Sequence, residues 1–149
     1  MLFPFIRRSL WIIPCLAMSV PGLVKAGEAK QAYKEREKAM ESLKDEMSAI
    51  KKALKADKPA TALEPAKKIE KITQNLPALF PEGSKVGHSE AKPEIWTNWA
   101  AFEKVAKNAA VKAADLVKAA ESGDKTKLET AANEMGAACK ACHKDYRGD

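Results

Sequence analysis

The chain has 149 residues, with 26 Lys and Arg against 20 Asp and Glu, so that its formal net charge is +6. This length suits one domain with one hydrophobic core. Lysine and glutamate are interleaved, and no Arg-rich cluster with neighbouring aromatic residues occurs, which argues against a nucleic-acid-binding protein.

The N-terminal residues have the pattern of a secretory signal peptide. Arg7 and Arg8 form a charged region, residues 10–20 are mostly apolar, and Val24 and Ala26 are small residues before a cleavage point. We predict cleavage after Ala26 and export to the periplasm by the general secretory route, because the residues that usually flank a twin-arginine pair are missing. The apolar run is too short to span a bilayer, so no membrane span is expected after cleavage; a permanent N-terminal anchor is the alternative.

Cleavage would divide the chain into a signal peptide, residues 1–26, and a single mature domain, residues 27–149. The signal segment contains three basic residues and no acidic one, so the net charge falls from +6 to +3. The lysines and glutamates that remain are typical of solvated helix faces. Cys15 leaves with the signal, so the mature domain keeps two cysteines, Cys139 and Cys142.

Four segments of the mature domain show an apolar period of 3.6 residues and predict helices. The first runs from about residue 28 to 55, and its inward stripe is Tyr33, Arg36, Met40, Leu43, Met47, Ile50 and Leu54. The second begins near Pro59, where proline suits a first helical turn, and carries Leu63, Ala66, Ile69, Ile72, Leu76 and Leu79.

A longer loop, residues 81–96, separates these helices from the last two. The third helix is predicted to begin near Thr97 or Asn98, either of which can cap it, and to bury Trp99, Phe102, Val105, Ala106, Ala109, Ala113, Leu116 and Val117. Ser122-Gly123-Asp124 is a helix stop followed by a candidate N-cap, so the fourth helix is predicted over residues 125–146.

The fourth segment ends in Cys139-Lys140-Ala141-Cys142-His143, the pattern of covalent haem attachment. Two thiols can form thioether bonds to the two vinyl groups on one edge of a porphyrin, and the adjacent imidazole then ligates the iron. We therefore predict one haem c, bound covalently at Cys139 and Cys142, with His143 as the proximal iron ligand. The predicted export signal agrees with this assignment, because c-type haem is attached outside the cytoplasm.

Two other uses of the cysteine pair are weaker. A thioredoxin-like dithiol expects a strand before the motif and an alternating α/β chain, and neither is visible. A zinc site needs further ligands, and His88 is the only spare histidine. His88 lies in a glycine-containing loop and is expected at the surface.

Short connections between the first two and the last two helices imply antiparallel neighbours, and no β-strand pattern competes, so an all-α fold is expected. With one longer crossing loop, the expected architecture is an antiparallel four-helix bundle that encloses one covalently attached haem c. The many alanines of the third and fourth helices are expected to leave room for the porphyrin.

Two residues of the first stripe are candidates for contact with the haem. Arg36 occupies a core position, and a buried guanidinium needs an anion, for which a haem propionate is the obvious candidate. The alternative is that Arg36 extends to water. Met40 lies one turn further, and a thioether opposite a histidine is a known iron ligand. Methionine is ordinarily a core residue. The periodicity therefore does not decide whether Met40, Met47 or neither of them is the iron ligand.

Over essentially its whole mature length the chain resembles the class II c-type cytochromes, the cytochrome c′ family. The resemblance rests on the terminal motif that extends from Cys139 to Arg147, on Phe80-Pro81-Glu82-Gly83-Ser84 and Pro93-Glu94-Ile95-Trp96 in the loop, and on Met47-Ser48-Ala49-Ile50 in the first helix. It implies that Arg36 is the arginine that contacts the haem and that Met40 occupies the distal position. The charged Lys44-Asp45-Glu46 departs from the family pattern.

The resemblance also implies a function, which depends on the distal residue. Members with methionine there are six-coordinate, low-spin electron carriers, so Met40 implies a periplasmic single-electron carrier, not an enzyme, with His143 and Met40 as iron ligands. Other periplasmic redox proteins are the expected partners, and the pattern allows a homodimer. Lys140 and Lys144 are expected either to orient an acidic partner or simply to be solvated.

Two other functions stay open. The first is a five-coordinate cytochrome c′ that binds small gases such as nitric oxide or carbon monoxide. The second is a structural or metal-binding helical bundle without haem.

Overall fold

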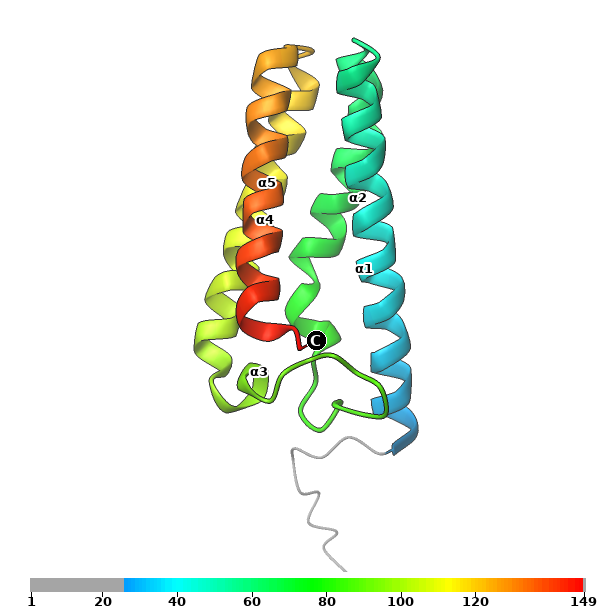
Figure 1. Cartoon of the computed structure of the whole chain (residues 1–149), viewed down its shortest axis with the longest axis vertical. Coiled ribbons are helices and arrows are strands. Elements are labelled where there is room, and N and C mark those ends of the chain that lie inside the picture. The colour runs from blue at the N-terminus through cyan, green and yellow to red at the C-terminus, as the bar shows by residue number, and fades with distance from the viewer. Residues whose placement is uncertain (1–25, 149) are drawn as a thin grey trace, which may run out of the picture.

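The computed structural model describes residues 26–148, and four long helices dominate this part of the chain (Figure 1). They are α1 (Ala26–Lys55), α2 (Leu63–Gln74), α4 (Trp99–Glu121) and α5 (Lys125–Tyr146). The shorter elements are the 3₁₀ turns η1 (Pro59–Ala62) and η2 (Leu76–Leu79) and the single turn α3 (Glu94–Thr97). The all-α prediction is therefore confirmed.

The predicted signal peptide lies outside the described residues, apart from Ala26, the first residue of α1. Its cleavage and the domain boundary that depends on it stay predictions. Within residues 26–148, no helix is both long enough and apolar enough to cross a bilayer.

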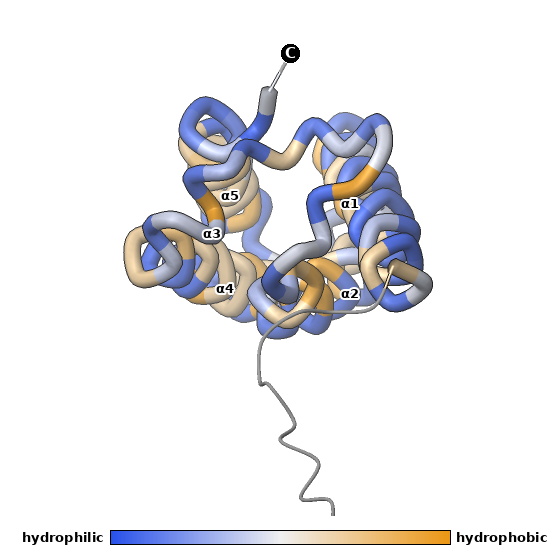
Figure 2. Tube along the Cα trace, turned by 90° about the horizontal axis from the view of Figure 1, so that it is seen from below, coloured by the Kyte–Doolittle hydropathy of each residue, from blue (hydrophilic) through white to orange (hydrophobic). Residues whose placement is uncertain are grey.

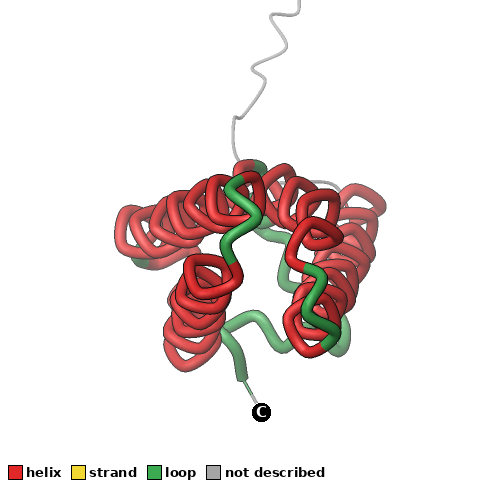
Figure 3. The backbone as a smooth tube through the Cα atoms, turned by 90° about the horizontal axis from the view of Figure 1, so that it is seen from above, coloured by secondary structure: helices red, strands yellow, loops and turns green. Residues whose placement is uncertain are grey.

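The long helices form the predicted antiparallel bundle. Figure 2, viewed along the bundle, places α5 and α1 on one side and α4 and α2 on the other, and Figure 3 shows the same arrangement from the opposite end. Helix α4 packs extensively on both α2 and α5, whereas the contact between α1 and α5 is sparse. The loop between α2 and α4 crosses the lower end of the bundle in Figure 1.

The second predicted helix is shorter in the structure than the sequence pattern indicated. A continuous helix was expected from about Pro59, but α2 covers only Leu63–Gln74, with a 3₁₀ turn on each side. Each of these turns has a proline in its first two positions, Pro59 and Pro77, and proline lacks the N–H that a continuing helix would need. The apolar period continues through the 3₁₀ turns, which explains why it suggested one helix.

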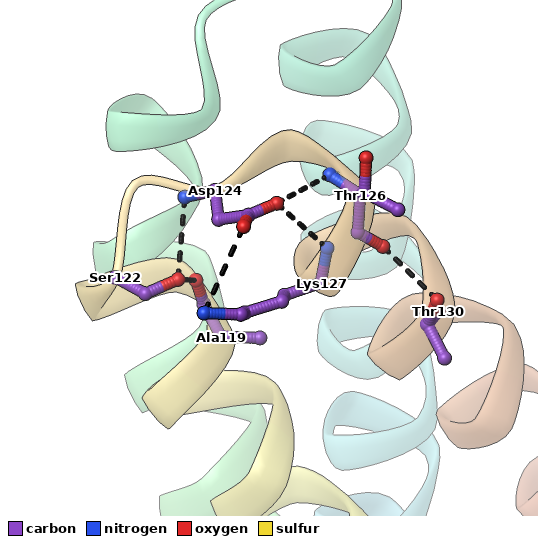
Figure 4. Close-up of polar contacts among 6 residues, drawn as sticks. All are labelled: Ala119, Ser122, Asp124, Thr126, Lys127 and Thr130. Carbon is purple, nitrogen blue, oxygen red and sulfur yellow. Dashed lines mark hydrogen bonds and ion pairs between the residues drawn. The ribbon is translucent and has the colours of Figure 1, made fainter.

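The turn between α4 and α5 confirms the predicted stop and cap. Gly123 has φ +66°, the left-handed conformation that glycine adopts without steric cost, and ends α4. The Asp124 carboxylate accepts hydrogen bonds from the backbone N–H groups of Thr126 (2.9 Å) and Lys127 (3.1 Å), as Figure 4 shows. By contrast, Asn98 stands at the N-cap of α4 without any side-chain capping bond.

The Asp124 cap leads to a first testable prediction. Hydrogen bonds, first of all from the backbone N–H of Lys127, hold the pKa of Asp124 below its ordinary value of 3.8. A lowered folded-state pKa means that the carboxylate stabilises the fold above about pH 4 and loses this effect as the pH falls through the lowered value. Asp124→Ala should therefore lower the melting temperature by a few degrees at neutral pH, with a smaller deficit in acid.

Thermal unfolding followed by circular dichroism from pH 7 to pH 2.5 measures this effect. Asp124→Asn is the matched control, because it keeps a capping oxygen but does not titrate. If Asp124→Ala lowered the melting temperature by the same amount over the whole pH range, the assigned role of the carboxylate would be contradicted.

The buried side chains form two clusters. The larger lies in the half of the bundle next to the α4–α5 turn and includes Ile50, Ile69, Leu116 and Leu128, all with no exposed surface. The smaller comprises Leu76, Phe80, Ile95, Phe102 and Ala106, with Phe102 edge-on to Phe80 (4.9 Å between centroids) and to Tyr146 (5.2 Å).

Three predictions about burial need correction, and the first concerns Val105 of α4, which is half-buried. Trp99 is 38% exposed because it is the first residue of α4 and lies at the edge of the smaller cluster, against Phe102. In the α1 stripe only Arg36 and Ile50 are buried, and the other predicted members are half-buried: Tyr33, Met40, Leu43, Met47 and Leu54. Several of these side chains face a cavity instead of a packed core.

Candidate functional site

A cavity of about 430 Å³ lies between α1 and α5. Its apolar walls come from all four long helices and η2, and include Met40, Leu43, Met47, Leu76, Ala109, Met135 and Ala138. The volume falls within the roughly 300–1,000 Å³ that is usual for ligand and cofactor sites. We call this space the first cavity.

A second cavity, of about 690 Å³, adjoins the first towards the crossing loop. The two share Met40, Lys44, Cys142 and His143. The walls of the second cavity are more polar, and Arg36, Glu37, Glu41, Glu90 and Arg147 contribute to them. The two spaces therefore meet where the predicted proximal and distal residues lie.

Helix α5 brings the three predicted attachment residues to one wall. Cys142 and His143 follow Cys139 by three and four residues, which is the spacing of neighbours on one helix face. All three line the first cavity, and both cysteines are free thiols. One turn earlier, Gly136 leaves open space where a side chain would otherwise project. The structure thus assembles the predicted motif beside an apolar space.

The electrostatic surroundings keep these groups uncharged at neutral pH. Burial, the neighbouring Cys139 and the charge of Asp145 raise the pKa of Cys142 to about 11. Burial likewise raises the pKa of Cys139. His143 is exposed overall, but partial desolvation and the charge of Arg147 lower its pKa, so the imidazole is neutral and has a free lone pair.

These residues fit a covalently attached haem better than a bare metal ion. Among residues 26–148, no group of three or more His, Cys, Asp and Glu side chains is arranged to hold a metal. A single imidazole is sufficient for an iron whose other ligands come from a porphyrin, and two thiols on the same wall match two thioether bonds. The alternatives of a zinc site and of a thioredoxin-like α/β chain therefore lack support in the described residues.

Arg36 is buried, as its place in the stripe predicted, with only 5% of its surface exposed. Its Nη1 donates to the carbonyl of Leu79 (3.0 Å) and to Ser84 Oγ (2.7 Å), and its Nη2 donates to the carbonyl of Ser84 (2.7 Å). Nη2 also reaches Ser89 Oγ at 3.4 Å, and the guanidinium lies over the ring of Phe80. The alternative that Arg36 extends to water is wrong, because loop oxygens surround it.

The sequence did not reveal this role of the crossing loop. Ser84 is fully buried and accepts two of the hydrogen bonds from Arg36. The one available signal was the need of a buried cation for acceptors, which does not say where along the chain they lie.

The distal candidates are both present at the cavities. Met40 lines both cavities, is half-buried and packs against the smaller core cluster. Met47 lines the first cavity and packs against the larger cluster. His88 is exposed at the edge of the second cavity, as predicted.

Comparison with known proteins gives a consistent result. The family model described as cytochrome C′ matches residues 31–147. Cytochrome c′ of Rhodospirillum rubrum is 32% identical over 146 residues, which cover 96% of this chain and 99% of that protein.

Solved structures agree with the sequence comparison. Cytochrome c′ of Thermochromatium tepidum has 29% identity and a TM-score of 0.75, over 81% of this chain and 97% of that one. A nitric oxide complex of a cytochrome c prime variant from Alcaligenes xylosoxidans has 27% identity and a TM-score of 0.74, with the same coverage. Another cytochrome c′, with 28% identity and a TM-score of 0.77 over 81% of this chain and 97% of its own, shows ligand-controlled dimer dissociation.

These relatives correct the predicted function. A six-coordinate, low-spin electron carrier with iron held by His143 and Met40 is wrong as the main interpretation. The family model, the relative from Rhodospirillum rubrum and the solved structures compared above are cytochromes c′, and one of these structures is a nitric oxide complex. The physical reason is that a methionine on an inward stripe need not bind metal. The packing of Met40 against the smaller core cluster is sufficient to place it on that stripe.

Proposed function

Because the chain belongs to the cytochrome c′ family, whose members carry covalently attached haem c, we propose that it binds a small gas such as nitric oxide or carbon monoxide at a five-coordinate haem iron. The observation that carries this proposal is the position of Cys139, Cys142 and His143 along one wall of an apolar cavity. In the proposed site the two cysteines hold the haem, and His143 is the proximal ligand.

When bound, the haem would supply an iron that can bind a diatomic gas. The two cysteines of α5 would fix the orientation of the ring, and His143 would supply the lone pair of its imidazole from the same wall. From α1, Leu43 and Met47 present apolar surface to the first cavity, which limits the size of a ligand and the entry of water. Met40 occupies the boundary of the two cavities as a packing residue.

Arg36 has a proposed role at the second cavity, as a partner of a haem propionate. Within residues 26–148 its hydrogen-bond acceptors are all neutral oxygens, and no carboxylate forms an ion pair with it. A buried positive charge without a counter-ion is unfavourable. Since Arg36 also lines the second cavity, a propionate there would compensate its charge.

The remaining parts of the proposal concern the setting of the protein. We propose a signal peptide over residues 1–26, a bundle domain over residues 27–149, and action in the periplasm, without enzymatic turnover. Support comes from the N-terminal pattern and from the extracytoplasmic attachment of c-type haem. A homodimer is part of the same proposal, and the relative with ligand-controlled dimer dissociation supports it.

Visible spectroscopy of the purified holoprotein tests the proposed function. We expect high-spin spectra in both oxidation states and ready binding of carbon monoxide by the ferrous form. Met40→Leu should leave the spin state unchanged, because the methionine is not required at the iron. A low-spin wild-type spectrum that Met40→Leu converted to high spin would contradict the proposal.

A cavity-filling variant makes the test specific for the first cavity. Leu43→Trp should slow the association of carbon monoxide about tenfold, because the larger side chain would occupy part of the first cavity; this rate change corresponds to about 1.4 kcal/mol in activation free energy. Val111→Trp is the matched control, because Val111 is 57% exposed on α4. Equal association rates in both variants would place gas binding elsewhere.

A further inference from the structure

The charged residues that line the first cavity all have the same sign. They are Lys44 and Lys51 of α1 and Lys140 of α5, and no Asp or Glu lines this cavity. All three are exposed, and they come from the two helices that stand side by side at the front of Figure 1. We call these three residues the lysine rim.

The positive charge of the lysine rim is not compensated within residues 26–148. None of the three lysines lies within ion-pair distance of a carboxylate there, although α1 and α5 both carry acidic residues. Glu46 of α1 instead pairs with Lys68 (2.8 Å), and Glu134 of α5 pairs with Lys112 (2.8 Å). These carboxylates are thus bound to lysines of α2 and α4.

The second cavity has a different charge pattern. Glu37, Glu41 and Glu90 line it, and their charges are balanced by those of Arg36, Arg147 and Lys44, the last of which lines both cavities. Glu90 forms an ion pair with Arg147 at 2.6 Å. An acidic molecule would therefore be attracted to the opening of the first cavity and not equally to that of the second.

We propose that the lysine rim is the docking surface for an acidic redox protein that exchanges electrons with the haem. Met47 and Cys139 line the same cavity as the rim, so apolar side chains are combined with exposed charge there, as in many protein interfaces. The inference rests on the proposed haem site, because Cys139, which would hold the haem, lines the same cavity as the three lysines.

The exchange is an outer-sphere transfer of one electron, in which no covalent bond forms or breaks. The acidic partner is oxidised by one electron and the iron is reduced from ferric to ferrous. Complementary charge raises the rate of encounter with the partner and orients it, and added salt screens both effects.

The binding of poly-L-glutamate to the holoprotein at low ionic strength, measured by titration calorimetry, tests the docking surface. In the triple variant Lys44→Gln/Lys51→Gln/Lys140→Gln we expect the affinity to fall about tenfold, because three exposed ion pairs are lost together. The matched control Lys30→Gln/Lys71→Gln/Lys104→Gln removes the same charge from exposed lysines that line neither cavity. It should change the affinity about twofold at most. Equal losses in both variants, or no loss in the rim variant, would overturn the inference.

Electron exchange supplies a second readout. Ferricyanide should oxidise the ferrous wild-type protein, poly-L-glutamate should slow this reaction, and the rim variant should lose the inhibition. A protein that failed to bind haem would show no change of a ferrous haem absorption spectrum on addition of ferricyanide but would still bind poly-L-glutamate at the rim. Failure of the proposed haem site is therefore distinguishable from failure of the docking surface.

Discussion

The double variant Cys139→Ser/Cys142→Ser is expected to contain no haem that resists extraction with acidified acetone, whereas the wild-type protein should retain essentially all of it. A serine hydroxyl does not form the thioether bond, and Cys139 and Cys142 are the two free cysteines in the described part of the chain. Each single variant can form one bond only and should give little mature holoprotein. The measurement is the haem content of the protein before and after extraction.

The chain supplies a matched control in Cys15, which the predicted cleavage removes. Cys15→Ser should leave the extraction-resistant haem unchanged. His143→Ala should keep the thioether bonds but alter the spectrum, because the proximal ligand is lost while both thiols remain. Resistant haem in the double serine variant would show that attachment does not depend on this pair.

The second large effect is expected for Arg36→Ala, which should lower the free energy of unfolding by about 3 kcal/mol. The substitution leaves the fully buried hydroxyl of Ser84 and the carbonyls of Leu79 and Ser84 without their donor. Hydrogen bonds to a charged group are stronger than neutral ones, and a buried acceptor without a donor is costly. Urea unfolding of the holoprotein, followed by far-UV circular dichroism, measures the change.

Two further variants separate the buried contacts from a general effect of charge. Lys38→Ala removes a positive charge from the exposed face of α1 and should change stability by about 0.5 kcal/mol or less. Arg36→Lys keeps the charge but loses the paired Nη1 and Nη2 donors, so an intermediate decrease in the free energy of unfolding is expected. If Arg36→Ala were as stable as Lys38→Ala, the crossing loop would not depend on the guanidinium.

Packing decided the surroundings of Arg36 and Met40. The period of α1 correctly placed Arg36 and Met40 on one inward stripe, but a period identifies a face and not what lies opposite it. The acceptors of Arg36 are 43 to 53 residues further along the chain, in a loop whose path the helical pattern does not predict. Met40 contacts a core cluster assembled from three other elements, so a ligand and a packing residue have the same sequence pattern.

The sequence by itself determined the features that depend on neighbouring residues: the helices, the Asp124 cap, and the placement of Cys139, Cys142 and His143 on one helix face. Hydrogen bonds and side-chain spacing within a few residues set these features, so they can be read along the chain. Only the tertiary structure decided that the motif faces an apolar cavity, that loop oxygens enclose Arg36, and that Lys44 and Lys140 share one opening. Each of these juxtapositions joins segments that are far apart in the sequence, and they meet because the four apolar faces can be buried only against one another.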